Sequence, residues 1–375
     1  MTETDWIGRA EALERLGVRA QTLYAYVSRG RIGMRPDPQD SRRSLYSAAD
    51  LERLALRRRR GRKASAIAAS AMAWGEPSIP TRISTIERGR PAYRGRDSIE
   101  LSVKCSLEDA AALLWEQSAP IRLACETAAG EAHDSPMVAL ARLAGASMAG
   151  LGRSPASLGA DGARAIGRLA LALGLGGGDA PVHERLARAW AVGPDAAALL
   201  RRALVLRADP DLSASTFAVR VAASPGASIP ACLLAGLATL SGPRHGGAAA
   251  ALSRLAGSAE ELGARAALEQ WLASGQALPG FGHPLYPEGD SRADALLERM
   301  EPDPAMAALG REAQVLAGLR PNIDFALVAA TRACRLPQDA PFTLFALGRS
   351  TGWVAHAIEQ VTTGGLIRPR ARYEG

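Results

Sequence analysis

Two histidines of the chain lie in glycine-rich turns. His245 falls in SGPRHGG at residues 241–247, and His283 falls in LPGFGHPLY at residues 278–286. Flanking glycines let a ligand approach each imidazole closely, and turns place side chains at the edges of clefts. Asp324 stands at the start of a helical run, where the helix dipole keeps a carboxylate ionised unless burial opposes it. Imidazole and carboxylate groups transfer protons in enzymes, so these three are candidate acid–base residues.

The elements that must position these residues are predicted to be helices. The 375 residues are rich in Ala, Leu, Gly and Arg, and only 5% are aromatic, which favours closely packed helices over a β-sandwich. Ala-rich segments predict helices at residues 107–116, 135–148, 162–173 and 183–206, and residues 77–84 and 86–93 are predicted as short strands or loops. The predicted fold class is all-α.

The basic charge of the chain is concentrated at its N-terminal end. Residues 1–63 contain 15 Lys and Arg against 8 Asp and Glu, which equals the whole net charge of +7. A short helix is predicted at 10–16, with a glycine as its stop, and a second helix at 19–28. This pattern, with the turn at 36–40 and SRRSLY at 41–46, resembles the winged helix-turn-helix of excisionases and MerR-type regulators. Residues 1–63 are therefore predicted to be a winged helix-turn-helix-like module.

Such a module places its second helix in the major groove of DNA. The resemblance implies DNA contacts from residues on or near that helix and from wing residues on flanking phosphates: Gln21, Thr22, Tyr24, Arg29, Arg42 and Arg43. The alternative is a small helical module that contacts its own larger domain or a protein partner. The basic run at 57–63 would neutralise phosphates, or it would form a solvated helix end or linker.

Other features argue against several classes of protein. The cysteines, at positions 105, 125, 232 and 334, form no CxxC pair, so neither a zinc site nor a disulfide framework is predicted. The opening residues lack the pattern of a secretory signal, and the longest apolar stretch, around 229–240, is too short to span a bilayer. We therefore expect a cytoplasmic protein without a metal and without a membrane partner.

Several segments, in order, resemble citrate synthase. The turns around His245 and His283 and the segment RPNIDF at 320–325 are followed by LGRSTGWVAH at 347–356 and by IRPR at 367–370. The likeness runs from about residue 64 to the last residue. On these motifs the chain is identified as a member of the citrate synthase family.

Membership of this family implies an all-α enzyme with two domains. Residues 64–245 and 337–375 would form the larger domain, and residues 246–336 the smaller one, with a cleft between them that closes on the ligand. The family condenses acetyl-CoA, or propionyl-CoA, with oxaloacetate or a related 2-oxo acid, and then hydrolyses the thioester to citrate, or 2-methylcitrate, and CoA. The resemblance also implies a homodimeric acyltransferase without a permanently bound cofactor, since acetyl-CoA and CoA are substrate and product.

The resemblance implies a role for each acid–base residue. A methyl group next to a thioester is a poor acid, so its deprotonation needs a positioned base and a donor to the developing enolate oxygen. Asp324 is similar in position to the family's base, His245 to its enol-oxygen donor, and His283 to the histidine that protonates the ketone oxygen. A neutral imidazole suits the donor role.

Three arginines match the family's carboxylate-binding positions. Guanidinium groups bind carboxylates through paired hydrogen bonds, which lysine cannot do. Arg292 and Arg349 resemble two clamps for the 2-oxo acid, and Arg368 resembles the arginine that is donated across the dimer interface. The loop that receives the adenine end of CoA is matched by Leu278, Pro279, Gly280, Phe281 and Gly282.

One segment departs from the family pattern. The family carries a stretch like HADHELNAS, whose second histidine binds the 2-oxo acid, whereas this chain has RADPDLSAS at 207–215. Pro210 thus replaces that histidine, and Ser213 replaces the asparagine. Proline has no side-chain donor, and losing one charge-assisted hydrogen bond costs ~1.5–3 kcal/mol. Arg207 is a candidate replacement; otherwise the departure favours weak activity or an electrophile other than oxaloacetate.

Two functions follow from the sequence. The first is a citrate synthase-type acyltransferase. The alternative is a DNA-binding transcription regulator whose degenerate synthase domain senses a CoA ester or a dicarboxylate, and it rests on the basic N-terminal module and Pro210. The remaining histidines, His133, His183 and His356, are interpreted as structural or surface residues.

Overall fold

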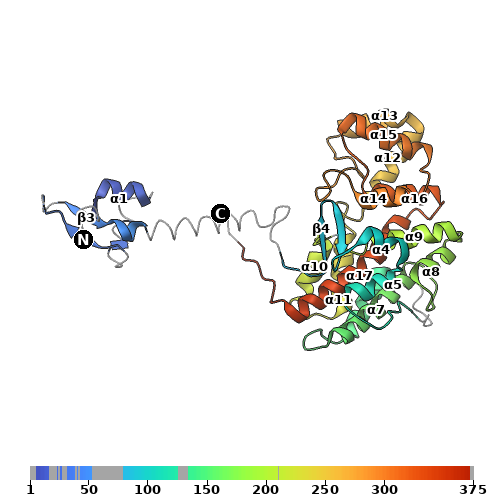
Figure 1. The fold of residues 1–375 in the computed structure, drawn as a ribbon, viewed down its shortest axis with the longest axis horizontal. Coiled ribbons are helices and arrows are strands. Elements are labelled where there is room, and N and C mark those ends of the chain that lie inside the picture. Colours follow the sequence, from blue (N-terminus) through green and yellow to red (C-terminus); the bar gives the residue numbers. More distant parts are fainter. Residues whose placement is uncertain are drawn as a thin grey trace. The chain divides into compact units, whose positions relative to one another are not determined.

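The structure of the chain falls into two units. This computed structural model describes residues 6–16, 23, 26–27, 32–38, 40, 43–52, 79–125, 134–209 and 211–371. The units are Met1–Pro80 and Thr81–Gly375, and both are drawn in Figure 1. Among the described residues, no helix has the length and apolar character needed to cross a membrane.

The first unit contains a small antiparallel sheet and a helix. Strands β1 (Trp6–Gly8), β2 (Met34–Pro36) and β3 (Ser44–Ser47) lie in the order β1-β3-β2. Tyr46 at the centre of β3 is paired with Ile7 on one side and Met34 on the other. Helix α1 (Arg9–Leu16) follows β1 and matches the helix predicted at 10–16. Apolar side chains of these elements form a core of their own.

The predicted DNA contacts fall mainly outside the described residues. Those outside are Gln21, Thr22, Tyr24, Arg29 and Arg42. Arg43 is described, and it lies immediately before β3 with its Nε 3.4 Å from the Asp40 carboxylate. The β2–β3 hairpin spans the predicted turn at 36–40.

A three-stranded antiparallel sheet opens the second unit. Strands β4 (Ser84–Glu87), β5 (Arg90–Tyr93) and β6 (Arg96–Asp97) are joined by two tight turns. In the first turn Arg88 and Gly89 both have positive φ, 51° and 73°, as the two-residue hairpin turn that suits twisted strands requires. The segment predicted at 86–93 therefore contains parts of two strands and the turn between them.

The rest of the second unit is helical, which confirms the all-α fold class. The helices are α4 (Ser98–Lys104), α5 (Leu107–Leu114), α6 (Pro136–Gly145), α7 (Pro155–Ala172), α8 (Val182–Ala189), α9 (Pro194–Leu206), α10 (Ala214–Ala223), α11 (Ile229–Leu240), α12 (Ala248–Leu262), α13 (Ala264–Ala273), α14 (Ser291–Leu297), α15 (Pro304–Ala317), α16 (Ile323–Ala333) and α17 (Ala340–Thr363).

Polar caps and prolines set where these helices begin. The side chains of Ser154 and Ser213 accept hydrogen bonds from backbone N–H groups in the first turns of α7 and α10. Pro194 begins α9, because proline cannot supply the N–H that a continuing helix needs. The prediction of one helix at 183–206 is therefore wrong: α8 and α9 are separated by a turn in which Ala191 has a φ of 53°.

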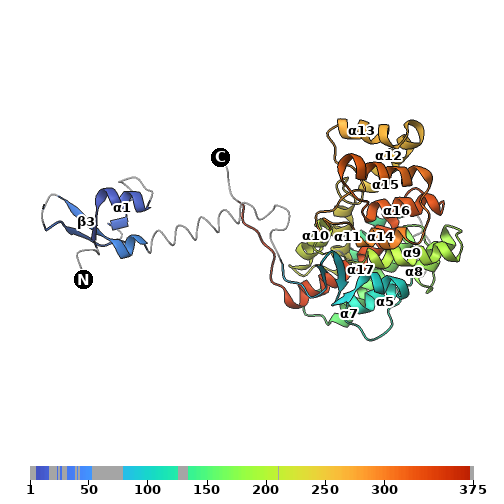
Figure 2. The ribbon, with the colours of Figure 1, turned by 45° about the horizontal axis from the view of Figure 1, so that its top comes forward.

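Two hydrophobic clusters organise the second unit. The larger cluster surrounds α17, which is buried along most of its length and packs against α5, α7, α9, α10 and α11. The smaller cluster contains residues of α12, α13 and α15, helices that lie together at one end of the unit in Figures 1 and 2. Helix α16 belongs to both, since Leu327 and Ala330 pack in the larger cluster and Phe325 and Val328 in the smaller.

Candidate active site

His245 lies in the turn between α11 and α12, as the sequence predicts. Its Nε2 is 2.8 Å from the hydroxyl of Ser215 on α10, and its ring packs edge-on against Phe345 at 5.2 Å. Burial, together with the nearby cations Arg349 and Arg207, lowers the pKa of His245 to about 3. The imidazole is therefore neutral at pH 7, and a neutral ring can donate one hydrogen bond.

His283 lies in the loop between α13 and α14. Its Nδ1 accepts a hydrogen bond of 3.2 Å from the backbone N–H of Leu285. Burial, together with the charge of Arg292, lowers the pKa of His283 to about 4. In the neutral ring the proton then resides on Nε2, because Nδ1 is the acceptor. His283 thus presents one N–H donor.

Asp324 is the second residue of α16, and the loop of His283 is bonded to the start of that helix. The side chain of Asn322 caps α16 by accepting from the backbone N–H of Asp324 at 2.9 Å, and its amide donates to the carbonyl of Gly282 at 2.9 Å. Backbone hydrogen bonds from Gly282 to Arg320 and from Asn322 to Gly280 join the same two segments. One cap therefore positions Asp324 and the residue before His283 together.

Arg207 brings Asp324 and His245 to a common centre. Its Nη1 is 3.5 Å from Oδ1 of Asp324, and its guanidinium carbon is 3.3 Å from the centre of the Phe345 ring that His245 also contacts. Burial lowers the pKa of Arg207 to about 10 although Asp324 opposes the shift, so Arg207 remains charged at pH 7. Asp324 and His245 therefore border the Arg207–Phe345 pair, while the Asn322 cap joins His283 to Asp324.

Arg349 and Arg292 are both buried near this centre, but their hydrogen-bond acceptors differ. Arg349 donates from Nε to the carbonyl of Arg207 at 3.1 Å and from Nη1 to the hydroxyl of Ser213 at 3.0 Å. Arg292 donates from Nε and Nη2 to the carboxylate of Asp290, at 2.9 and 2.8 Å. Burial opposes the charge of Arg292, but Asp290 outweighs it and raises the pKa of Arg292. Nε and Nη2 of Arg292 are thus already bonded to Asp290, and Nη1 is the guanidinium nitrogen that lies outside this ion pair.

The remaining predicted residues have different environments. Arg368 is exposed in the segment that follows α17, and it makes none of the contacts that join the other described site residues. In the predicted CoA loop, Leu278 and Phe281 are buried in the smaller cluster, and Gly280 and Gly282 adopt positive φ values of 81° and 64°. Pro210 lies outside the described residues.

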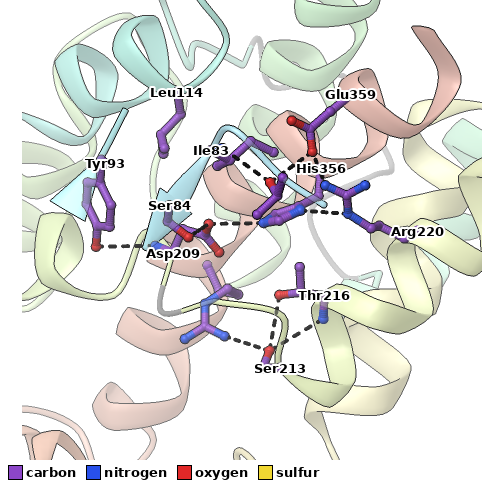
Figure 3. Close-up of polar contacts among 12 residues, drawn as sticks. Ile83, Ser84, Tyr93, Leu114, Asp209, Ser213, Thr216, Arg220, His356 and Glu359 are labelled. Carbon is purple, nitrogen blue, oxygen red and sulfur yellow. Dashed lines mark hydrogen bonds and ion pairs between the residues drawn. The ribbon is translucent and has the colours of Figure 1, made fainter. Parts of the chain in front are cut away.

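A buried polar network next to the site was not predicted from the sequence. Figure 3 shows His356 between Asp209 and Arg220: its Nε2 is 3.0 Å from the Asp209 carboxylate, and its Nδ1 accepts from Arg220 at 2.9 Å. Asp209 also accepts from the hydroxyl of Ser84 at 2.6 Å, and Arg220 pairs with Glu359. The network fixes the segment that contains Arg207 to α10, α17 and β4, which agrees with a structural role for His356.

Two further residues that support the site were also missed. Asp290 neutralises Arg292 and accepts from the backbone N–H of Ile323 at 2.9 Å, so it ties α14 to the start of α16. Ser215 positions His245. An acid two residues before a predicted substrate arginine is a signal that could have indicated Asp290, whereas nothing local in the sequence indicates the partner of His245.

Comparison with known proteins identifies relatives of this chain. The family model for the citrate synthase C-terminal domain matches residues 174–370. A citrate synthase of Haloferax volcanii is 34% identical over 191 residues, which cover 46% of this chain and 49% of the relative. The chain thus spans about half the length of the curated relatives it matches.

Solved structures match over more of the chain. The citrate synthase of Thermotoga maritima superposes with a TM-score of 0.67 at 25% identity, covering 82% of this chain and 96% of that one. A ternary complex of carboxymethyl coenzyme A and oxaloacetate with citrate synthase from Thermoplasma acidophilum gives a TM-score of 0.65 at 24% identity, covering 79% and 93%, and supports the fold alone. Since the family model covers more than half of the chain, the protein belongs to the citrate synthase family.

Proposed function

We propose that this chain is a citrate synthase-type acyltransferase that condenses acetyl-CoA or propionyl-CoA with oxaloacetate or a related 2-oxo acid. The observation that carries the proposal is the placement of Asp324 and His245 beside the buried guanidinium groups of Arg207 and Arg349, with the loop of His283 hydrogen-bonded to the cap of the Asp324 helix. A base, two neutral imidazoles and carboxylate-binding cations are the groups that this condensation needs.

In the proposed reaction Asp324 removes a proton from the carbon next to the thioester. His245 donates a hydrogen bond to the oxygen on which the negative charge of the enolate develops. The enolate carbon then attacks the ketone carbon of the 2-oxo acid, and the ketone oxygen takes the Nε2 proton of His283 as its bond to carbon becomes single. Asp324 afterwards loses its added proton to solvent and His283 regains one from solvent, so both groups return to their starting states. Water finally hydrolyses the thioester of the condensed product, which releases CoA and a free carboxylate. Both imidazoles start neutral because burial lowers their pKa values.

The substrates are assigned to the segments that the family pattern matches. Arg349 and the free Nη1 of Arg292 bind carboxylates of the 2-oxo acid, and the loop 278–282 receives CoA. Residues 64–245 with 337–375 form a larger domain and residues 246–336 a smaller one. The protein is proposed to act as a cytoplasmic homodimer in which Arg368 reaches the site of the partner.

The test is release of free CoA thiol from acetyl-CoA or propionyl-CoA with a panel of 2-oxo acids. Asp324→Asn is the matched control, because it removes the base and keeps the shape of the side chain. We expect the variant to release CoA ~10²–10⁴-fold more slowly. If no pair of substrates gives release above the rate of the variant, the proposal is wrong.

We also propose that residues 1–63 form a winged helix-turn-helix module that binds DNA. The support is its net charge of +7, which is the net charge of the whole chain, and the β2–β3 hairpin at the position of the wing. Electrophoretic retardation of the protein's own upstream DNA should weaken steeply with added salt, because binding releases counterions. Retardation that is absent at low salt, or insensitive to salt, would contradict this proposal.

A further inference from the structure

The guanidinium group of Arg207 is buried with donors left over. The side chain is 4% exposed, and its Nε and Nη2 have no hydrogen-bond partner among the described residues. A buried N–H group without an acceptor costs free energy, so native proteins rarely keep one without a reason such as a ligand. Two such donors on one cation, next to a proposed catalytic base, indicate a place for an anion.

The ion pair with Asp324 does not satisfy the hydrogen-bond donors of the Arg207 guanidinium group. Nη1 is 3.5 Å from Oδ1 of Asp324, whereas charge-assisted hydrogen bonds are ~2.7–2.9 Å long. Asp324 pairs with Nη1, and Nε and Nη2 on the other side of the fork have no hydrogen-bond partner among the described residues. A carboxylate that binds Nε and Nη2 together makes the paired hydrogen bonds for which arginine is suited.

A second cation lies against the same side chain. Arg349 donates to the carbonyl of Arg207, and both guanidinium groups face the ring of Phe345, at 3.3 and 4.9 Å. Burial, with the charge of Arg207, lowers the pKa of Arg349 to about 9, so both groups remain charged at pH 7. Two adjacent buried cations repel each other, and a dianion between or beside them relieves that repulsion. The position of Arg207 at the C-terminus of α9 also favours a cation there.

We propose that Arg207 is a fourth substrate-binding guanidinium, which donates from Nε and Nη2 to a carboxylate of the 2-oxo acid beside Asp324. It thereby supplies the contact that Pro210 cannot make. This inference rests on the proposed function and assigns its electrophile to a dicarboxylate. It also makes Arg207 a determinant of specificity, because a 2-oxo acid with one carboxylate leaves part of the cation cluster unpaired.

The test combines Arg207→Gln, which removes the charge, with Arg207→Lys, which keeps the charge but not the paired donors. Arg202→Gln is the matched control, since Arg202 is a buried arginine within α9 whose nearby charged groups are Arg299, Glu298 and Arg201. The probe is oxaloacetate, titrated into each protein by calorimetry, and the KM of each substrate is measured in the CoA-release assay.

Arg207→Gln is expected to weaken oxaloacetate binding ~10–100-fold and to raise the KM for the 2-oxo acid by a similar factor, with little change in the KM for acyl-CoA. Arg207→Lys is expected to bind more tightly than Arg207→Gln and more weakly than the wild type. Arg202→Gln should bind as the wild type does. If Arg207→Gln does not fold, Arg207→Lys decides the question.

Other outcomes separate the inference from the proposed function. If the wild type catalyses CoA release and both Arg207 variants bind oxaloacetate as tightly as the wild type, the inference is wrong and the proposed function remains supported. Equal loss in the Arg207 and Arg202 variants, or no oxaloacetate binding by the wild type, also overturns the inference. Arg207-dependent oxaloacetate binding without CoA release from any acyl-CoA supports the inference and refutes the proposed function.

Discussion

Replacing Asp290 with asparagine is expected to destabilise the second unit strongly. The Asp290 carboxylate accepts hydrogen bonds from Nε and Nη2 of Arg292, at 2.9 and 2.8 Å, and from the backbone N–H of Ile323 at 2.9 Å. The side chains of Asp290 and Arg292 are each 1% exposed. Removal of one charge leaves the other buried without a counter-charge, which costs ~3–5 kcal/mol.

The expected change in melting temperature follows from this free energy. Each kcal/mol corresponds to ~2–4 °C for a domain of ~150–250 residues, so Asp290→Asn should melt ~6–20 °C below the wild type at pH 7. Circular dichroism during heating measures the shift. Asp294→Asn is the matched control on α14, because its ion pair with Arg320 is exposed and 3.4 Å long. Exposed pairs contribute ~0–1 kcal/mol, so the control should melt within ~4 °C of the wild type.

The stability difference between wild type and Asp290→Asn depends on pH in a defined direction. Burial favours the neutral carboxyl group, but Arg292 outweighs burial and holds the pKa of Asp290 below its ordinary value of 3.8. A carboxylate whose pKa is lower in the folded state stabilises that state above the unfolded pKa, and this stabilisation is lost as the pH falls through the folded pKa. The full difference should persist from pH 7 to ~5 and shrink below pH ~4.

Two results would refute this reasoning. If Asp290→Asn and the control Asp294→Asn melt at the same temperature at pH 7, Arg292 does not depend on Asp290 for its counter-charge. A stability difference that has already vanished at pH 6 would show that the pKa of Asp290 is raised, and that burial outweighs its partner.

Three further predictions concern the site and its packing. The His245 ring should remain neutral above pH ~4 because its folded pKa is about 3. Unfolding then takes up protons between pH ~6.5 and 3, so the free energy of unfolding should decrease as the pH is lowered through that range. An NMR titration that gives the ring a pKa above 6 would contradict this. Ser215→Ala should lower kcat ~2–10-fold in the CoA-release assay with KM values little changed, because one hydrogen bond that positions His245 is lost; an unchanged kcat would show that Ser215 is dispensable. Gly352→Ala should lower the free energy of unfolding, measured with denaturant, by ~1–3 kcal/mol or more, because its Cβ would lie 2.3 Å from the carbonyl oxygen of Ala208. Gly365→Ala is the control and should have no effect, because no atom lies within 4 Å of its Cβ. Equal effects of the two substitutions would contradict the proposed clash.

The local setting of the chemistry-bearing residues could be predicted from the sequence. Glycines next to His245 and His283 predict turns, and both histidines lie in turns or loops between helices. The segment RPNIDF predicts a helix start, and Asp324 is the second residue of α16. These signals are local, since glycine, proline and capping residues act on the backbone within a few positions of themselves.

The partners of these residues could not be predicted, because they are distant in sequence. Ser215 and His245 are 30 residues apart, and Arg220 and His356 are 136 apart. Packing of the helices brings such pairs together, and no periodicity in the sequence encodes it. The structure adds a partner that the expectation for Arg292 did not include: a buried guanidinium needs a counter-charge, and Asp290 supplies it within the protein.

Helix α16 packs in the larger and the smaller hydrophobic cluster at once, so its axis settles where both sets of contacts are satisfied. A void created on either side, at Leu327 or at Phe325, therefore shifts the Asp324 carboxylate as well as lowering stability. The position of Asp324 thus depends on the packing of two separate hydrophobic cores. During evolution the two interiors cannot diverge independently, because a volume change in one must be compensated in the other before the Asp324 carboxylate returns to its place.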